Sequence, residues 1–171
     1  MKKIIYNENN LTDKDITEKT IKVKALIINS KDEIMLGYSY NTYQFPGGTL
    51  EEGETLIDTL NREIEEETGI NLKLKDIEPF LALYGYYKDY PDIGKNKKVE
   101  IYYYEIKTDE LPKLNNTNYT DSEKKGNFKL KTIPLEDIEN ELNKNVSEFG
   151  DSKGIAKEML TAIKFYKDSK I

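Results

Sequence analysis

The segment GTLEEGETLIDTLNREIEEETGI, residues 48–70, decides the fold of this 171-residue chain. Glu63, Glu66 and Glu67 stand at positions i, i+3 and i+4, which puts their side chains within roughly 100° of one another on one face of a predicted helix. Like charges at these spacings repel each other. A divalent cation such as Mg²⁺ or Mn²⁺ relieves that repulsion, because it takes hard carboxylate oxygens as ligands. The alternative interpretation is an acidic helix face that only contacts water.

The same segment carries signals for both ends of the helix. Thr55, with Asp58 three residues later, predicts the N-cap, and Gly69 predicts the C-terminal stop. We therefore expect a short amphipathic helix with the acids along the edge of its buried stripe. The residues expected on the buried face are Ile57, Leu60 and Ile64.

The spacing of these residues resembles the signature of the Nudix hydrolases, the MutT-like family. In a given register such a match would arise by chance well below about once in a million. The flank Tyr43–Gly48 also resembles the strand end and glycine turn that lead into the signature. The matching residues are Gly48, Glu54, Arg62, Glu63, Ile64, Glu66, Glu67, Gly69 and Ile70.

The resemblance implies a Mg²⁺-dependent pyrophosphohydrolase that cleaves a nucleoside diphosphate linked to another group X. Metal-activated water would attack phosphorus. By the resemblance, Glu63, Glu66 and Glu67 are metal ligands, and the carbonyl oxygen of Gly48 is a further candidate. Mn²⁺ is the expected substitute for Mg²⁺.

The general base stays open between an acid of the signature and an acid on a later loop. Glu66 is the candidate inside the signature. Among later acids we prefer Glu123, which lies just before an expected strand, and Glu100 is the second choice. For Glu123 and Glu100 the alternative is an ordinary surface acid.

Arg62 is the one arginine among 26 basic residues. It precedes Glu66 by four residues, so its planar guanidinium can hold that carboxylate in a fixed orientation. By the resemblance, Glu54 is structural and supports the start of the helix through Arg62. Coincidence is the alternative, because a single arginine must fall somewhere.

Tyr86 and Tyr87 follow Ile70 by 16 and 17 residues. In parts of the family a tyrosine near this place accompanies dinucleoside polyphosphate hydrolysis and stacks on a base. The chain has 13 tyrosines, so a chance match is the alternative. Tyr86 and Tyr87 are therefore candidate substrate-binding residues.

Composition restricts the class of protein further. The chain has neither cysteine nor histidine, which excludes a thiol nucleophile, a Ser-His-Asp triad and the usual zinc ligands. Its net charge of −6 argues against a nucleic-acid partner. No membrane helix or signal peptide is evident. We expect a cytoplasmic protein that acts on a small-molecule nucleotide, and the family's frequent dimers make a homodimer an open possibility.

We expect a single Nudix hydrolase domain over residues 1–171, with an N-terminal extension at 1–20, the Nudix box at 48–70 and a C-terminal helix at 153–167. The pattern predicts an α/β (α+β) fold, and the resemblance implies a Nudix-type α/β/α sandwich with a mixed β-sheet. Strands are expected at 3–6, 21–28, 33–38, 71–87 with a break near Pro79, 98–106 and 128–132. The remaining expectations are a functional loop at 108–127 and a helix at 134–143 with Pro134 in its first turn.

Two other functions compete with the hydrolase. A catalytically silent Nudix-type domain that binds or senses a nucleotide would usually have a degraded signature, whereas the signature here is intact. An isopentenyl-diphosphate isomerase-like member is disfavoured, because that chemistry uses a cysteine and this chain has none.

Overall fold

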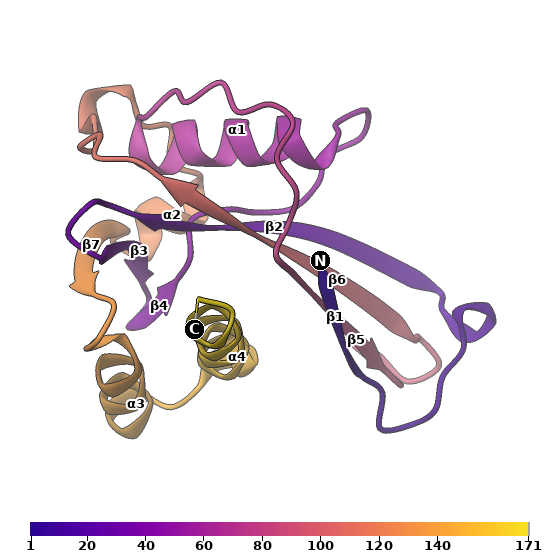
Figure 1. The fold of residues 1–171 in the computed structure, drawn as a ribbon. Coiled ribbons are helices and arrows are strands. Elements are labelled where there is room, and N and C mark those ends of the chain that lie inside the picture. Colours follow the sequence, from indigo (N-terminus) through magenta and orange to yellow (C-terminus); the bar gives the residue numbers. More distant parts are fainter. Residues whose placement is uncertain (171) are drawn as a thin grey trace.

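The computed structural model describes residues 1–170, and within them a seven-stranded mixed sheet is covered by helices on both faces (Figure 1). Helix α1 lies on one face, and α3 and α4 lie on the other, which confirms the predicted α+β sandwich. The strands are β1 (Lys2–Tyr6), β2 (Glu18–Ile28), β3 (Glu33–Ser39), β4 (Thr42–Gln44), β5 (Leu81–Tyr87), β6 (Lys97–Lys107) and β7 (Lys129–Pro134). The helices are α1 (Leu56–Thr68), α2 (Asp121–Lys125), α3 (Ile138–Phe149) and α4 (Ile155–Asp168).

The sheet has the strand order β1-β5-β6-β2-β3-β4, and β7 pairs with β3. Strands β1 and β5 are parallel, as are β2 and β6, and the other neighbours are antiparallel. The pairing of β2 with β6 runs without a break from Glu18 opposite Lys97 to Ile28 opposite Lys107. Strand β2 is therefore the central support of the sheet.

The glycine turn, Phe45–Gly48, lies beside the middle of β2, where β3 no longer pairs with it. The Val23 amide donates to the Gly48 carbonyl at 3.0 Å, and the Ala25 amide donates to the Pro46 carbonyl at 2.8 Å. The turn thus takes the place of a neighbouring strand and brings the start of the Nudix box against the sheet.

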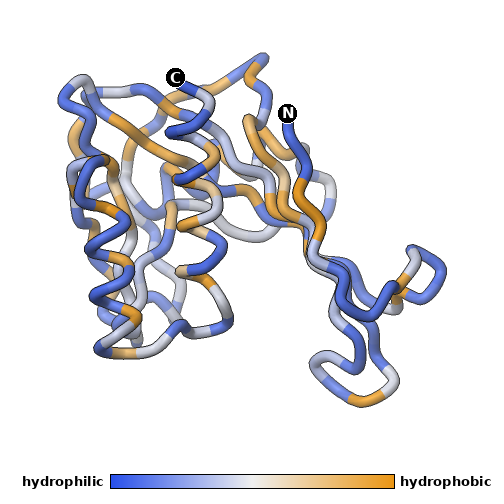
Figure 2. Tube along the Cα trace, turned by 60° about the horizontal axis from the view of Figure 1, so that its bottom comes forward, coloured by the Kyte–Doolittle hydropathy of each residue, from blue (hydrophilic) through white to orange (hydrophobic). Residues whose placement is uncertain are grey.

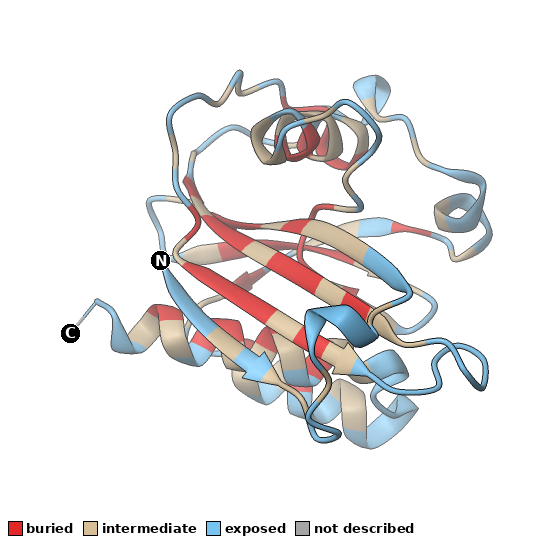
Figure 3. Cartoon of the chain, turned by 90° about the vertical axis from the view of Figure 1, so that its right-hand side faces the viewer, coloured by how far each residue is buried: buried red, intermediate tan, exposed pale blue. Residues whose placement is uncertain are grey.

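Alternation along β2 divides the core into two clusters, because successive side chains point to opposite faces. Val23, Ala25 and Ile27 pack on the α1 side together with Leu60 and Ile64 of that helix. Leu26 and Ile28, which point the opposite way, pack on the side of α3 and α4. Figure 3 shows the buried residues concentrated in the central strands and on the inner side of α1.

Helix α4, which the sequence predicted at 153–167, closes the second cluster with its apolar face. Met159, Ala162, Ile163 and Tyr166 of this helix are all buried. The N-terminal extension is part of the sheet, since β1 pairs with β5 along its whole length. Figure 2 shows the far ends of these strands as a mostly hydrophilic projection beyond the helices.

The long strand predicted at 71–87 is wrong in its first half, because residues 71–80 are irregular and β5 begins at Leu81. Both polar atoms of the Asn61 side chain bond the Leu74 backbone, at 2.7 and 3.0 Å. Leu72, Leu74 and Ile77 pack onto the α1 cluster. Their apolar pattern therefore reflects packing beside α1 rather than strand pairing.

The segment 108–127, predicted as a loop, also contains a 3₁₀ turn at Leu114–Asn116 and the short helix α2. It docks on the C-terminal end of α1. The Lys113 amide donates to the Thr68 carbonyl and the Asn118 amide to the Glu66 carbonyl, each at 2.8 Å. These donors satisfy carbonyls that a helix end leaves without intrahelical partners.

Pro134 ends β7, where it is paired with Glu33, and does not start a helix as predicted. The Leu135 amide then donates to the Asp32 carbonyl at 2.8 Å, which prolongs the contact with the turn before β3. Helix α3 consequently begins at Ile138. Among residues 1–170, no helix has both the length and the apolar character needed to cross a membrane.

Candidate active site

Helix α1 has the boundaries that its sequence predicted. The Thr55 side chain accepts from the Asp58 amide at 3.2 Å, and the Asp58 carboxylate accepts from the Thr55 amide at 2.9 Å. Gly69 ends the helix in the left-handed conformation, with φ of 72°. Between these two ends, Glu63 and Glu67 lie beside the glycine turn and not on an open helix face.

Arg62 holds three carboxylates at once. Its Nε and Nη2 donate to the two oxygens of Glu54, at 2.6 and 2.9 Å. Its Nη1 donates to Glu63 at 2.8 Å and to Glu66 at 3.3 Å, and Nη2 also reaches the Thr49 carbonyl at 3.2 Å. The hydrogen bonds from Arg62 lower the pKa of Glu54 to about 2. Arg62 thus ties the loop before α1 to two candidate ligands.

The carboxylate of Glu63 lies directly against Gly48. A Cβ atom at position 48 would collide with the Glu63 carboxylate, so glycine leaves the space that this acid occupies. Burial raises the pKa of Glu63, while Arg62 opposes the shift. The Gly48 carbonyl accepts the Val23 amide, which uses one of its two lone pairs.

Glu67 is the most enclosed of the three acids, with 3% of its surface exposed. Its Oε2 accepts from the Gly47 amide at 3.2 Å. Burial raises the pKa of Glu67 to about 8, although the nearby ammonium of Lys24 opposes the shift. A buried acid of this kind has its charge stabilised by a cation.

Lys24 is a functional candidate that the sequence interpretation missed. Its Nζ donates to the Gly47 carbonyl at 2.6 Å and to the Phe45 carbonyl at 3.0 Å. Burial lowers the pKa of Lys24, and the charge of Glu67 opposes this. The available signal was a lysine inside a strand that becomes continuously apolar.

A cavity of about 310 Å³ opens between α1 and the segment before β7. It brings Glu123 of α2 to the same space as Glu63 and Glu66. One oxygen of Glu123 accepts from the amide and the hydroxyl of Thr120, at 2.6 and 2.9 Å. The lining residues are Thr49, Glu51, Arg62, Glu63, Glu66, Asn118, Tyr119, Thr120 and Glu123.

Glu100 lies away from this cavity, on β6. It is 5% exposed and is bonded by Lys19 at 3.0 Å, Lys98 at 3.2 Å and the Tyr102 hydroxyl at 3.0 Å. Burial acts to raise the pKa of Glu100, but these three donors keep it below the ordinary value. The geometry therefore gives Glu100 a structural role in the sheet.

Tyr86 and Tyr87 point to opposite faces of the sheet, because they are consecutive residues of β5. The Tyr86 hydroxyl donates to Asp13 at 3.0 Å. Tyr87 packs near Tyr90, with 5.8 Å between ring centroids. Both tyrosines border a second cavity of about 400 Å³, which also includes Glu158 of α4. They do not line the cavity beside the box acids.

Glu63 and Glu67 fit a divalent cation by their chemistry, since their hard oxygens lie against the glycine turn and burial raises the pKa of both. Arg62 partly neutralises the negative charge of Glu63 and Glu66. In the part of the chain that the structure describes, no three acidic side chains are grouped closely enough to surround one ion as they stand.

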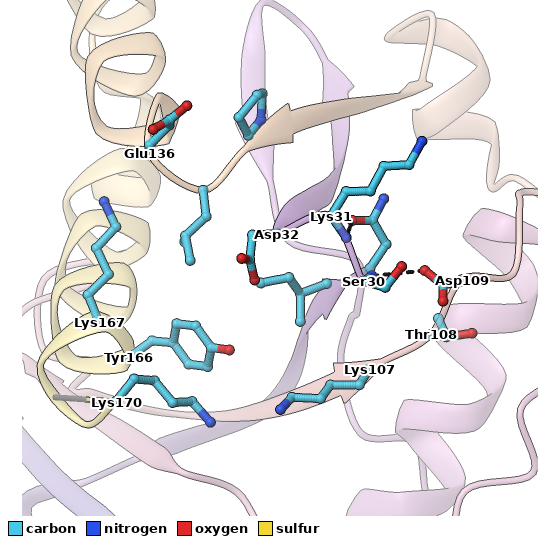
Figure 4. Close-up of a pocket in the computed structure, with 14 residues that line it drawn as sticks. Ser30, Lys31, Asp32, Lys107, Thr108, Asp109, Glu136, Tyr166, Lys167 and Lys170 are labelled. Atoms are coloured by element: carbon cyan, nitrogen blue, oxygen red, sulfur yellow. Dashed lines mark hydrogen bonds between the residues drawn. The ribbon is translucent and has the colours of Figure 1, made fainter.

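A larger hollow, of about 950 Å³, lies at the C-terminal end of β2 and is lined by none of the candidate residues (Figure 4). Figure 4 shows Lys167, near the end of α4, and Lys170, just beyond that helix, beside the hollow. Lys167 pairs with Glu139 at 2.7 Å, and Lys170 pairs with Glu105 at 2.9 Å. Two of the lysines that line this hollow therefore already have acidic partners.

A family model described as the NUDIX domain matches residues 18–150. No curated protein matches the chain. Among solved structures, a C. elegans Ap4A hydrolase in a binary complex is similar with a TM-score of 0.54 and 17% identity, covering 87% of this chain and 96% of that one. The MutT protein from Bacillus halodurans has a TM-score of 0.50 and 20% identity, with 71% and 72% covered. At these identities the two structures show a shared fold.

Proposed function

Because this chain belongs to the Nudix family and is a hydrolase of phosphoric anhydride bonds, we propose that it is a Mg²⁺-dependent pyrophosphohydrolase of a nucleotide derivative. The observation that carries the proposal is that Glu63 and Glu67 lie against the glycine turn while Arg62 holds Glu63 and Glu66. Mn²⁺ is the proposed substitute for Mg²⁺.

The proposed metal ligands are Glu63, Glu66, Glu67 and the Gly48 carbonyl. Arg62 orients the first two, and the Gly47 amide orients the third. A bound Mg²⁺ would neutralise charge on the pyrophosphate and lower the pKa of a water molecule. The chain's own contribution is to hold these oxygens in place and to keep Glu67 away from bulk water.

We propose Glu123 as the residue that takes the proton of the attacking water, with Glu66 as the alternative. Glu123 is supported by its place in the same cavity as Glu63 and Glu66. Its position is fixed by the capping bonds from Thr120. A general base needs this kind of fixed position within reach of the water.

The nucleoside is proposed to bind in the second cavity, where aromatic side chains border a space of about 400 Å³. Tyr87, Tyr90 and Tyr6 offer ring surfaces of the kind on which a base stacks. Tyr86 contributes less, because its hydroxyl is bonded to Asp13. A structural neighbour is named an Ap4A hydrolase, which makes Ap4A the first substrate to try.

The test is product analysis with Ap4A and other dinucleoside polyphosphates, ADP-ribose, NADH and nucleoside triphosphates, each with Mg²⁺ and with EDTA. We expect cleavage of one class, and its loss with EDTA. Glu67→Gln should lower turnover by roughly two orders of magnitude or more without lowering the unfolding midpoint. The matched control is Glu65→Gln, an exposed acid on the same helix.

Two results would contradict the proposal. Full activity of Glu67→Gln would remove the assigned roles of the box acids. Failure to cleave any substrate, with a nucleotide still bound, would favour the silent nucleotide-binding domain instead.

A further inference from the structure

Three consecutive residues of β2 satisfy all four carbonyls of the glycine turn. The backbone amides of Val23 and Ala25 bond the carbonyls of Gly48 and Pro46. The other two carbonyls, of Phe45 and Gly47, point the other way, and both accept from the Lys24 side chain. Lys24 therefore bonds the two turn carbonyls that the backbone amides of β2 do not reach.

The turn held in this way has little freedom of its own. Gly47 has φ of 132°, and a Cβ atom there would collide with the Val23 carbonyl. The Gly47 amide donates to Glu67, while its carbonyl accepts from Lys24. Gly47 thus lies between the buried Glu67 and the half-buried Lys24, and a shift of the turn would change the orientation of Glu67.

The charges around Lys24 come from several elements. Glu67 and Glu63 of α1 and Glu158 of α4 favour its ammonium form, and Lys22 on the same strand disfavours it. Because the neighbourhood is mainly acidic, a cation at position 24 is balanced by its surroundings. Loss of the cation would increase the repulsion among the carboxylates.

We propose that Lys24 is a positioning residue, which fixes the glycine turn so that the Gly47 amide meets the Glu67 carboxylate and Gly48 lies against the Glu63 carboxylate. This inference rests on the proposed function of those acids as a metal site. In this proposal Lys24 acts through the turn and through Glu67.

The experiment compares Lys24→Met, Lys24→Arg and Lys24→Gln with the wild-type chain. Lys22→Met is the matched control, because Lys22 lies on the same strand two residues away. The readouts are Mn²⁺ binding by EPR without substrate, the NMR amide signals of Gly47 and Gly48 without metal, and kcat and KM separately. The unfolding midpoint of each variant is measured alongside.

We expect Lys24→Met to weaken Mn²⁺ binding and lower kcat by about 10- to 100-fold, as for other residues that orient metal ligands, with a smaller change in KM. The Gly47 and Gly48 amide signals should move. Lys24→Arg should keep the Mn²⁺ affinity and kcat within about threefold of the wild-type values, because a guanidinium keeps the charge and can donate to two carbonyls. Lys22→Met should match the wild-type chain.

Wild-type values for Mn²⁺ binding and for both amide signals in Lys24→Met would overturn the proposal. A Lys24→Arg variant as defective as Lys24→Met at an unchanged unfolding midpoint would also overturn it. If Lys24→Met does not fold, Lys24→Gln takes its place in the same comparison. The binding and NMR readouts need no substrate, so an inactive wild-type chain would count against the proposed function and not against the role of Lys24.

Discussion

Gly47 and Gly48 are adjacent, yet a side chain is excluded at each for a different reason. A Cβ atom at Gly47 would meet the backbone of Val23 and Lys24, and its φ of 132° disfavours any other residue. A Cβ atom at Gly48 would meet the end of the Glu63 side chain, which can rotate away. The first glycine serves the fold, and the second serves the position of an acid.

We therefore expect the two alanine variants to fail in different assays. Gly47→Ala should lower the free energy of unfolding by about 1–3 kcal/mol, because the backbone must shift. Gly48→Ala should change stability by less than about 1 kcal/mol but lower turnover at least about tenfold, because Glu63 is displaced. Urea unfolding and turnover of each variant check this, and a fully active Gly48→Ala would contradict it.

The pairing of Glu54 with Arg62 predicts a dependence of stability on pH. Arg62 lowers the pKa of Glu54 to about 2 from 4.5, so the ionised form is favoured in the folded protein. The contribution of the ionised Glu54 to the stability of the folded protein is present above pH 4.5 and is lost as the pH falls toward 2. The Glu54 side chain is 18% exposed, so solvent screening weakens its ion pair with Arg62.

Glu54→Gln should accordingly lower the free energy of unfolding at pH 7 by about 1–3 kcal/mol. The difference from the wild-type chain should narrow between pH 4.5 and pH 2 as the wild-type carboxylate becomes protonated. Urea unfolding at several pH values measures it, with the exposed neighbour Glu52→Gln as control. A difference that stays constant with pH would show that the pair does not act through its charge.

The sequence predicted the residues of the site that lie within one helix. Spacing alone places Glu63, Glu66 and Glu67 on one face, and Arg62 lies within reach of its neighbours. Lys24 could not be found in this way, because only the tertiary structure puts its long side chain against a turn about twenty residues later. The metal-binding and catalytic roles of all these residues stay predictions.

At the scale of elements, local signals predicted α1 and β6 well and failed where distant contacts decide. Capping residues fix the ends of α1. In contrast, residues 71–80 have a strand-like apolar pattern but are held by Asn61 across the surface of α1. Pro134 is extended because β7 pairs with β3, a contact that no local signal reveals.

Helix α4 lies outside the matched region 18–150 but completes one of the two clusters. Ile163 has no exposed surface, and Phe165 stacks on Phe80 with 6.3 Å between ring centroids. The matched region is therefore not expected to fold alone. A chain truncated after Gly150 should lack a cooperative unfolding transition in circular dichroism.

A point substitution tests the same element without removing it. Ile163→Ala should lower the free energy of unfolding by about 2–5 kcal/mol, because it leaves a cavity in the core. Lys164→Ala, at an exposed position on the same helix, should change it by less than about 0.5 kcal/mol. Cooperative unfolding of the truncated chain at the wild-type midpoint would contradict the role given to α4.

At the scale of the whole molecule, the alternation of β2 and the signature of α1 were enough to predict a mixed sheet between helices. The sequence also predicts a strand at 3–6, but not its position in the sheet, because no local signal reveals which strand β1 pairs with. Its place is set by pairing with β5. The oligomeric state is likewise not contained in these patterns, and a homodimer stays a prediction that light scattering can check.

The pairing of β2 with β6 affects how the chain folds while the ribosome synthesises it. Glu18 and Lys97, which pair in the folded protein, are 79 residues apart in sequence. At typical rates of synthesis, β2 emerges about 4–16 s before its partner strand. During that interval the edge of the apolar run Ala25–Ile28 that faces β6 has no partner and is open to pairing with other chains. Slower, cooler expression with chaperones present should therefore raise the yield of native protein.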